Sequence, residues 1–388
     1  MNVYMDHGAA CPVDPRVLKV MTPYFSESFG NPSSFHTLGF DAQRVVGRAR
    51  EQVATLIGAQ SSEIVFTSCA TESNNLGITG AVLRYRKKGS RVVVSEIEHI
   101  SILNICKELS RQGFEIQYAP VNQDGILDVE RLKELVNGET VLVSVMAANG
   151  EIGTIQPIKE AAEMAHDHDA LFHTDATVAA AQIPLETSSM KFDLMTLSSN
   201  DLYGPKGVGA LYVRKGLRLK PHMVGGGQED GLRSGSENVP GIVGMGEAAE
   251  IIREEMASES ERLLGLRDKL IGGITDAVPE SYLNGHPTKR LPNNANIRFS
   301  YIEGESLILS LDQLGIRVSS GSACVAKTLE PSHVLRALGL KHEEAHGSLV
   351  FTLGKSNRGE DVEYVIQKMP DVVRRLRAMS PLTPKEMV

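Results

Sequence analysis

The chain has 388 residues, of which 41% are hydrophobic and 23% are charged, as in an ordinary folded protein with room for two domains. The net charge of −8 and the isoelectric point near 5.8 argue against nucleic acid as the main partner, since phosphate binding needs clustered Lys and Arg. The N-terminal residues lack the basic region and apolar run of a signal peptide, and no stretch approaches the roughly 18 apolar residues of a membrane helix. We therefore expect a cytoplasmic protein with no nucleic-acid or membrane partner.

The first half of the chain alternates between helix-like and strand-like patterns. Apolar residues recur at helical spacing over 40–57, and residues 63–67 then read as a strand. Further short apolar runs follow, most of them separated by helix-length segments such as 158–168: 91–95, 114–118, 141–145, 171–173, 194–197 and 210–213. This alternation predicts an α/β fold with a mostly parallel sheet covered by helices.

The second half predicts a smaller α+β domain. A glycine-rich stretch at 225–241 precedes a long amphipathic helix that ends near residue 276. Beyond it we expect strands at 295–300 and 349–352, and helices near 305–314, 332–338 and 362–379. We place the large domain at residues 15–257 and the small domain at residues 258–388 together with 1–14.

The loops at the carboxyl ends of the predicted strands are the first place to look for a site. Residues 68–74 put small and hydroxyl side chains at a helix start, which suits a phosphate, although N-capping by Thr71 or Ser73 explains the same residues. His99 opens the next helix, where histidine usually caps or packs. Asp175 ends an apolar strand, where it either caps the next helix or pairs with a buried cation such as the pyridine nitrogen of pyridoxal phosphate.

The order of these features resembles that of the fold-type I pyridoxal-phosphate enzymes, with a glycine-rich strand end at 203–209 completing the set. More narrowly, nearly the whole chain resembles the cysteine desulfurases of the NifS and IscS kind. The segments that carry this resemblance are 4–6, 12–16, 30–34, 66–68, 70–74, 98–99, 149–153, 172–177, 203–211, 225–229, 233–235, 237–241, 318–324 and 329–340.

The resemblance implies roles for individual positions. Ala70 and Thr71 would hold the cofactor phosphate, His99 would stack on the ring and shuttle protons as a catalytic residue, and Asp175 would pair with the pyridinium nitrogen. Further contacts with the cofactor or substrate are implied for Asn149 beside the ring, for Ser198 and Asn200 on the phosphate, and for Ser236, which would reach the phosphate of the other subunit. That last role requires a homodimer.

The cysteines differ in their surroundings. Cys11, Cys69, Cys106 and Cys324 form no CxxC pair, so neither a zinc site nor a disulfide framework is indicated. Cys106 lies on an apolar helix face and is expected in the core. Cys324 lies among small, flexible residues, which favours a reactive thiol over a packed one.

The resemblance makes Cys324 the second catalytic residue. Its thiolate would take sulfur from L-cysteine as a persulfide, release L-alanine and deliver the sulfur to an IscU-like iron–sulfur scaffold protein. It is also a candidate iron ligand, to a 2Fe-2S cluster shared with that scaffold.

The stretch 198–207, SSNDLYGPKG, departs from the family pattern. Asp201 stands where the family has the lysine that forms a Schiff base with the cofactor, and since a carboxylate cannot form an imine, we expect pyridoxal phosphate to bind non-covalently. Lys206 matches a separate family lysine. Val178 and Val350 stand where the family has a Gln for the ring hydroxyl and an Arg for the substrate carboxylate. Losing charge-assisted hydrogen bonds worth about 1.5–3 kcal/mol each should weaken cysteine binding tenfold or more.

Two functions fit this sequence. The first is a cysteine desulfurase for iron–sulfur cluster assembly whose activity is weakened by Asp201. The second is a non-catalytic assembly subunit that binds an IscU-like scaffold and offers Cys324 as a persulfide relay or cluster ligand. A related lyase acting on another amino acid would leave Cys324 without a task.

Overall fold

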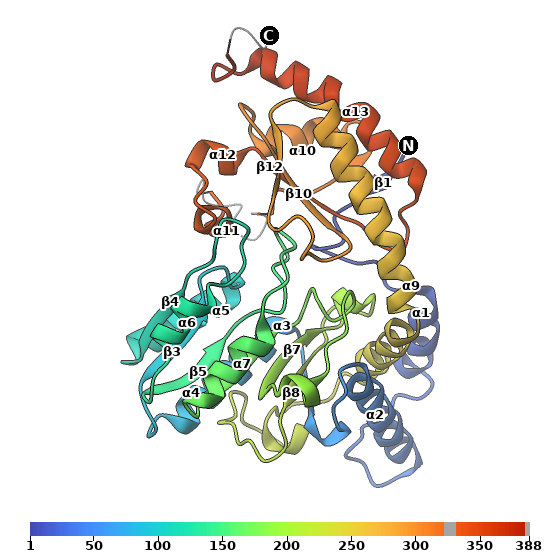
Figure 1. Ribbon diagram of the computed structural model, residues 1–388. Helices are drawn as coiled ribbons and strands as arrows, with labels where there is room; N and C mark the ends of the chain where they lie inside the picture. Colours follow the sequence, from blue (N-terminus) through green and yellow to red (C-terminus); the bar gives the residue numbers. More distant parts are fainter. Residues whose placement is uncertain (322–330, 385–388) are drawn as a thin grey trace.

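The computed structural model describes residues 1–321 and 331–384. Its central element is a seven-stranded sheet of order β2-β8-β7-β6-β5-β3-β4 (Figure 1). Neighbouring strands from β7 to β4 pair in parallel, whereas β8 is antiparallel to both β2 and β7. The strands are β2 (Ile64–Thr67), β3 (Arg91–Ser95), β4 (Glu115–Ala119), β5 (Thr140–Ser144), β6 (Leu171–Asp175), β7 (Leu194–Ser198) and β8 (Gly209–Val213).

Helices cover both faces of this sheet. Val92 and Val94 of β3 pack in one hydrophobic cluster and Val93 in another, because successive side chains of a strand point to opposite faces. The prediction of a helix-covered, mostly parallel sheet is therefore confirmed. The helices of this part are α1 (Pro15–Met21), α2 (Thr37–Leu56), α3 (Ala70–Asn74), α4 (Gly80–Tyr85), α5 (Ile100–Arg111), α6 (Val129–Leu135), α7 (Ile158–Asp167) and α8 (Thr187–Met190).

A smaller α+β unit has its own sheets and core, as predicted. Its antiparallel sheet has the order β12-β10-β9, and β1 pairs in parallel with β11. Phe299, Phe351 and Met369 are buried in its hydrophobic cluster. The elements are β1 (Val3–Tyr4), β9 (Ser281–Asn284), β10 (Asn294–Phe299), β11 (Ile316–Arg317), β12 (Ser348–Thr352), α10 (Gly304–Asp312), α11 (His333–Ala337), α12 (His342–His346) and α13 (Gly359–Met379).

One long helix, α9 (Val239–Ala277), belongs to both units. Its first half packs against α1 and α2, and its second half packs against α13 (Figure 1). Met245 is buried in the core of the large unit, and Leu270 in the core of the small one. The boundary that we predict after residue 257 falls inside this helix, and it stays a prediction.

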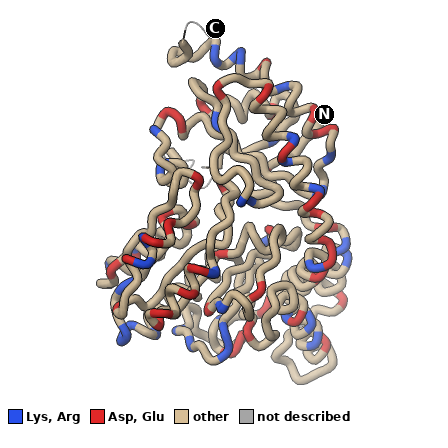
Figure 2. Tube along the Cα trace, viewed as in Figure 1, with Lys and Arg blue, Asp and Glu red and all other residues tan. Residues whose placement is uncertain are grey.

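Charged residues of both signs are interspersed along the whole trace (Figure 2). Among the described helices, none combines the length and the apolar composition needed to cross a membrane.

Candidate active site

Asp175 ends β6 as a buried carboxylate, 6% exposed. Its Oδ2 accepts a hydrogen bond from Asn74 Nδ2 at 2.8 Å, and its Oδ1 accepts one from the amide of Thr177 at 3.0 Å. Neither donor carries a charge, and no ion pair of Asp175 occurs within residues 1–321 and 331–384. A buried carboxylate held this way is suited to a protonated ring nitrogen, which would supply the missing positive charge.

The first turn of α3, which follows β2, has no side-chain cap. α3 begins at Ala70, and Cys69 at the N-cap forms no side-chain capping hydrogen bond. Thr71 is exposed, and Ser73 is buried with its hydroxyl 2.7 Å from that of Thr67. Neither residue caps this helix, so the amides of its first turn can bind a phosphate.

His99 is the N-cap of α5, as the capping alternative proposes. Its Nδ1 accepts a hydrogen bond from the amide of Ser101 at 3.2 Å and lies 2.8 Å from the Ser101 hydroxyl. A neutral ring therefore carries its proton on Nε2. The hydroxyl of Ser101 also accepts from Asn74 Nδ2 at 3.1 Å. A chain of hydrogen bonds thus runs from His99 through Ser101 and Asn74 to Asp175.

The sequence does not reveal that Ser101 and Asn74 take part in this series of hydrogen bonds. Asn74 stands in a motif that supports the resemblance, but nothing there indicates that its side chain reaches the strand-end aspartate. The only signal for Ser101 is a hydroxyl two residues after a helix-capping histidine.

Asn149 is engaged at both ends of its side chain. Its Oδ1 accepts hydrogen bonds from the amides of Glu151 and Ile152, and its Nδ2 donates to the carbonyl of Ile97 at 3.0 Å. These bonds hold the loop that follows β5. A contact with the cofactor ring or the substrate stays a prediction for this residue.

Asp201 lies in a short 3-10 turn, Asn200–Leu202, directly after β7. Burial and, more weakly, the neighbouring Asp175 raise the pKa of Asp201 to about 6, while hydrogen bonds with the side chains of Ser198 and Asn200 oppose this increase. Ser198 and Asn200, which the resemblance places on the cofactor phosphate, therefore bond to Asp201 in this structure. Lys206 is exposed, with its Nζ 3.3 Å from the carbonyl of Cys11.

The structure describes the surroundings of some of the remaining predicted site residues but not of all. Ser236 is exposed in the segment before α9, as a contact with another subunit requires. Val350 is buried in β12, and Cys106 is fully buried in α5. Cys324 lies outside the described residues. Within those residues, no group of three or more His, Cys, Asp or Glu side chains could hold a metal ion.

Comparison with known proteins identifies the class of protein that this fold and site define. The family model for class-V aminotransferases matches residues 3–365, and the chain belongs to that family. It is 55% identical to cysteine desulfurase IscS 1 of Archaeoglobus fulgidus, covering 98% of this chain and 99% of the relative. Identity to cysteine desulfurase IscS of Methanosarcina thermophila is 48%, covering 99% and 95%. A solved structure of a NifS-like protein superposes with a TM-score of 0.91 at 38% identity, covering 97% of this chain and 100% of that one.

Membership of this family implies pyridoxal phosphate as the cofactor, and the residues present fit it. Asp175 offers an uncompensated carboxylate to the ring nitrogen, and the first turn of α3 offers amides to the phosphate. The two features are joined by the Asn74 side chain, which extends from α3 to Asp175.

Proposed function

We propose that this chain is a pyridoxal-phosphate-dependent cysteine desulfurase that supplies sulfur for iron–sulfur cluster assembly. The observation that carries the proposal is the buried Asp175 carboxylate, which accepts a hydrogen bond from Asn74, the last residue of α3. The protein that holds it is 55% and 48% identical to two cysteine desulfurases. When bound, the cofactor supplies an electron sink for bond cleavage at the substrate. The protein's own task is to hold that group, orient L-cysteine and move protons.

His99 is suited to the proton transfer. Its Nδ1 is occupied by Ser101, so the exposed Nε2 is the atom that gives or receives a proton. The hydrogen-bond chain through Asn74 ties the ring position to Asp175. The Cys324 thiolate would take the sulfur as a persulfide, release L-alanine and pass the sulfur to an IscU-like scaffold protein.

Turnover is expected to be weak because Asp201 offers a carboxylate where an amine is expected. With a pKa raised to about 6, Asp201 is mostly ionised at neutral pH and can accept protons but cannot link to an aldehyde. We therefore infer that pyridoxal phosphate binds non-covalently. The same residue favours the alternative function, a non-catalytic assembly subunit that binds the scaffold and offers Cys324 as a relay or as a ligand of a shared 2Fe-2S cluster.

A homodimer is part of this proposal. Phe29, Phe35 and Phe40 are 65%, 94% and 55% exposed. Phe35 and Phe40 line a cavity of about 570 Å³ together with Glu237, the neighbour of Ser236. A second copy that covers these rings would remove apolar surface from water and would bring Ser236 to the neighbouring site.

The test is single-turnover incubation of the protein with pyridoxal phosphate and L-cysteine, followed by alanine analysis and peptide mass spectrometry. We expect one persulfide on Cys324 with an equal amount of alanine, both lost in Cys324→Ser and both kept in the control Cys69→Ala, which adds no capping hydroxyl at the start of α3. Alanine and persulfide at the level of cofactor in buffer alone would contradict the enzyme. A scaffold complex that carries an iron–sulfur cluster under those conditions would support the alternative.

A further inference from the structure

A small cavity adjoins Asp201 and is lined by residues of both units. It has a volume of about 20 Å³, which is room for one water-sized group. Its lining includes His7, Gln182, Asp201 and Asn293, which come from four separate segments of the chain.

The unpartnered polar atoms of these side chains are acceptors. His7 is 3% exposed, and its Nδ1 must donate to the carbonyl of Thr352 at 3.1 Å, since a carbonyl only accepts. Burial lowers the pKa of His7, so the ring is neutral and Nε2 is a bare acceptor. The Nδ2 of Asn293 donates to the carbonyl of Leu353, which leaves its Oδ1 as the free end. His7 Nε2, Asn293 Oδ1 and Gln182 Oε1 are buried and have no hydrogen-bond partner among the described residues.

Glycine at position 354 keeps the space beside His7 open. A side chain there would meet His7 Nε2 at 2.4 Å and the Tyr203 hydroxyl at 2.5 Å. Several donors around the cavity are already used: the amide of Gly8 donates to Thr352 Oγ1, and Asn294 Nδ2 donates to the carbonyl of Gly150. The Asp201 carboxylate accepts hydrogen bonds from Ser198 and Asn200. The three bare acceptors have no donor among the described residues.

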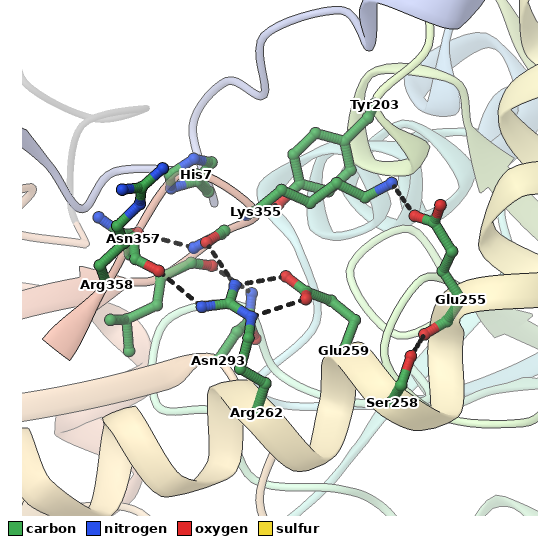
Figure 3. A network of polar contacts seen from close by, with 12 residues as sticks. His7, Tyr203, Glu255, Ser258, Glu259, Arg262, Asn293, Lys355, Asn357 and Arg358 are labelled. Carbon is green, nitrogen blue, oxygen red and sulfur yellow. Dashed lines mark hydrogen bonds and ion pairs between the residues drawn. The ribbon is translucent and has the colours of Figure 1, made fainter.

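The nearby cations are engaged elsewhere. Arg262 donates to Glu259 and to the carbonyls of Gly354 and Asn357 (Figure 3). Lys355 pairs with Asp14 and Glu255. Asp201 forms no ion pair within the described residues, and the other titratable groups facing the cavity are His7, Cys11 and Tyr203. Lys206 donates to the carbonyl of Cys11, which lines the cavity, but it forms no ion pair with Asp201. Among the described residues, the cavity therefore gathers a carboxylate and lone pairs without a cation paired to that carboxylate.

We propose that this cavity is a binding site for a single ammonium ion. Four N–H donors match the Asp201 carboxylate and the three bare acceptors, and the charge of the ion offsets that of the carboxylate. A water molecule would bring lone pairs of its own into a place already rich in acceptors. An alkali cation prefers oxygen ligands to the imidazole nitrogen of His7. The bound ion would place beside Asp201 a nitrogen atom that exchanges with ammonium in solution. The site is a property of the protein alone and does not rest on the proposed desulfurase activity.

The experiment measures the melting temperature of the full chain without cofactor, near neutral pH, as ammonium chloride replaces potassium chloride at constant ionic strength. We expect a saturable rise on the order of 2 °C, because a ligand that binds only the folded state stabilises it. Tetramethylammonium chloride, which has no N–H donor and is too large, should give no such rise. Asp201→Asn and Gln182→Met should abolish the response, and the exposed control Gln123→Met should keep it.

A second measurement needs only the wild-type protein, so it tests the proposal even if the site variants fail to fold. Line broadening of ¹⁵N-labelled ammonium by the wild-type protein, reversed by an excess of unlabelled ammonium but not of potassium, should show the bound ion directly. Equal melting curves in all three salts, a rise that survives in both site variants, or no broadening would each overturn the proposal.

Discussion

Asn74 is the residue whose side chain connects the separate parts of the candidate site. Its Nδ2 donates to both Asp175 and Ser101, so its loss removes one of the two hydrogen bonds to the buried carboxylate. Because a hydrogen bond to a charged group contributes about 1.5–3 kcal/mol, Asn74→Ala should weaken pyridoxal phosphate binding about tenfold or more. Fluorescence titration of the apoprotein measures this, with the exposed Asn104→Ala on α5 as the control. Equal affinity of the two variants would remove Asn74 from the site.

Glu151 brings together chain segments that are far apart in the sequence. Its carboxylate accepts a hydrogen bond from the Ser332 hydroxyl at 2.7 Å, and Oε1 is buried without a partner among the described residues. A side chain at Gly321, which has a φ of +73°, would meet the Glu151 carboxyl carbon at 2.8 Å. Burial raises the pKa of Glu151 to about 7.

This carboxyl group should make stability depend on pH. Its folded-state pKa lies above the ordinary value of 4.5, so the folded protein binds more protons than the unfolded chain between these values. The free energy of unfolding should therefore fall as the pH rises from 4.5 to about 7, by on the order of 3 kcal/mol from this group. Urea unfolding of the wild type and Glu151→Gln across this range isolates its share. A difference between the two proteins that does not vary with pH would contradict the assignment.

At the scale of elements, α9 contacts α2 through glycine. A Cβ on Gly246 would lie 2.6 Å from both Cα and Cβ of Ala49, whereas a Cβ on Gly265 of the same helix would meet nothing within 4 Å. Gly246→Ala should lower the free energy of unfolding by about 1–3 kcal/mol through overpacking. Gly265→Ala should raise it by about 0.5–1 kcal/mol, since alanine favours the helix. Chemical denaturation measures both, and similar effects of the two changes would contradict this packing.

The elements that the sequence predicts well are those with a continuous apolar pattern. β3 has the predicted bounds, and α7 and α13 lie within a few residues of theirs, because each buries a regular set of apolar side chains. The two-residue strands β1 and β11 are too short to carry a pattern, and their pairing depends on the meeting of distant segments. The antiparallel placement of β8 also comes from the tertiary arrangement, since its apolar run reads like those of the parallel strands.

In the candidate site too, features with a local sequence pattern could be predicted, and those that depend on tertiary contacts could not. Asp175 and the start of α3 could be predicted because each follows a buried strand, where sheet ligands bind. The contacts of Asn74 with Ser101, and of Glu151 with Ser332, join segments whose proximity no local pattern encodes. The acceptor-rich cavity beside Asp201 likewise needs four segments to meet.

At the scale of the whole molecule, the exposed phenylalanines should decide the assembly state. Phe35 is 94% exposed in the single chain, so Phe35→Asp should shift the sedimentation coefficient to that of a monomer. Its cofactor affinity should also fall, because Ser236 of the second subunit would no longer reach the site. Leu309→Asp, an equally drastic change at a 67% exposed position on α10, serves as the control and should remain dimeric. A wild-type protein that sediments as a monomer would contradict the dimer.

The central claim is that this class-V family member holds pyridoxal phosphate without a covalent link, because Asp201 stands after β7 where an amine is expected. Borohydride reduction of the cofactor-loaded protein followed by peptide mass spectrometry tests it most directly. We expect no pyridoxyl group on any wild-type peptide and a pyridoxyl group at position 201 in Asp201→Lys. A pyridoxyl group on Lys206, or on any other amine of the wild-type chain, would contradict the account.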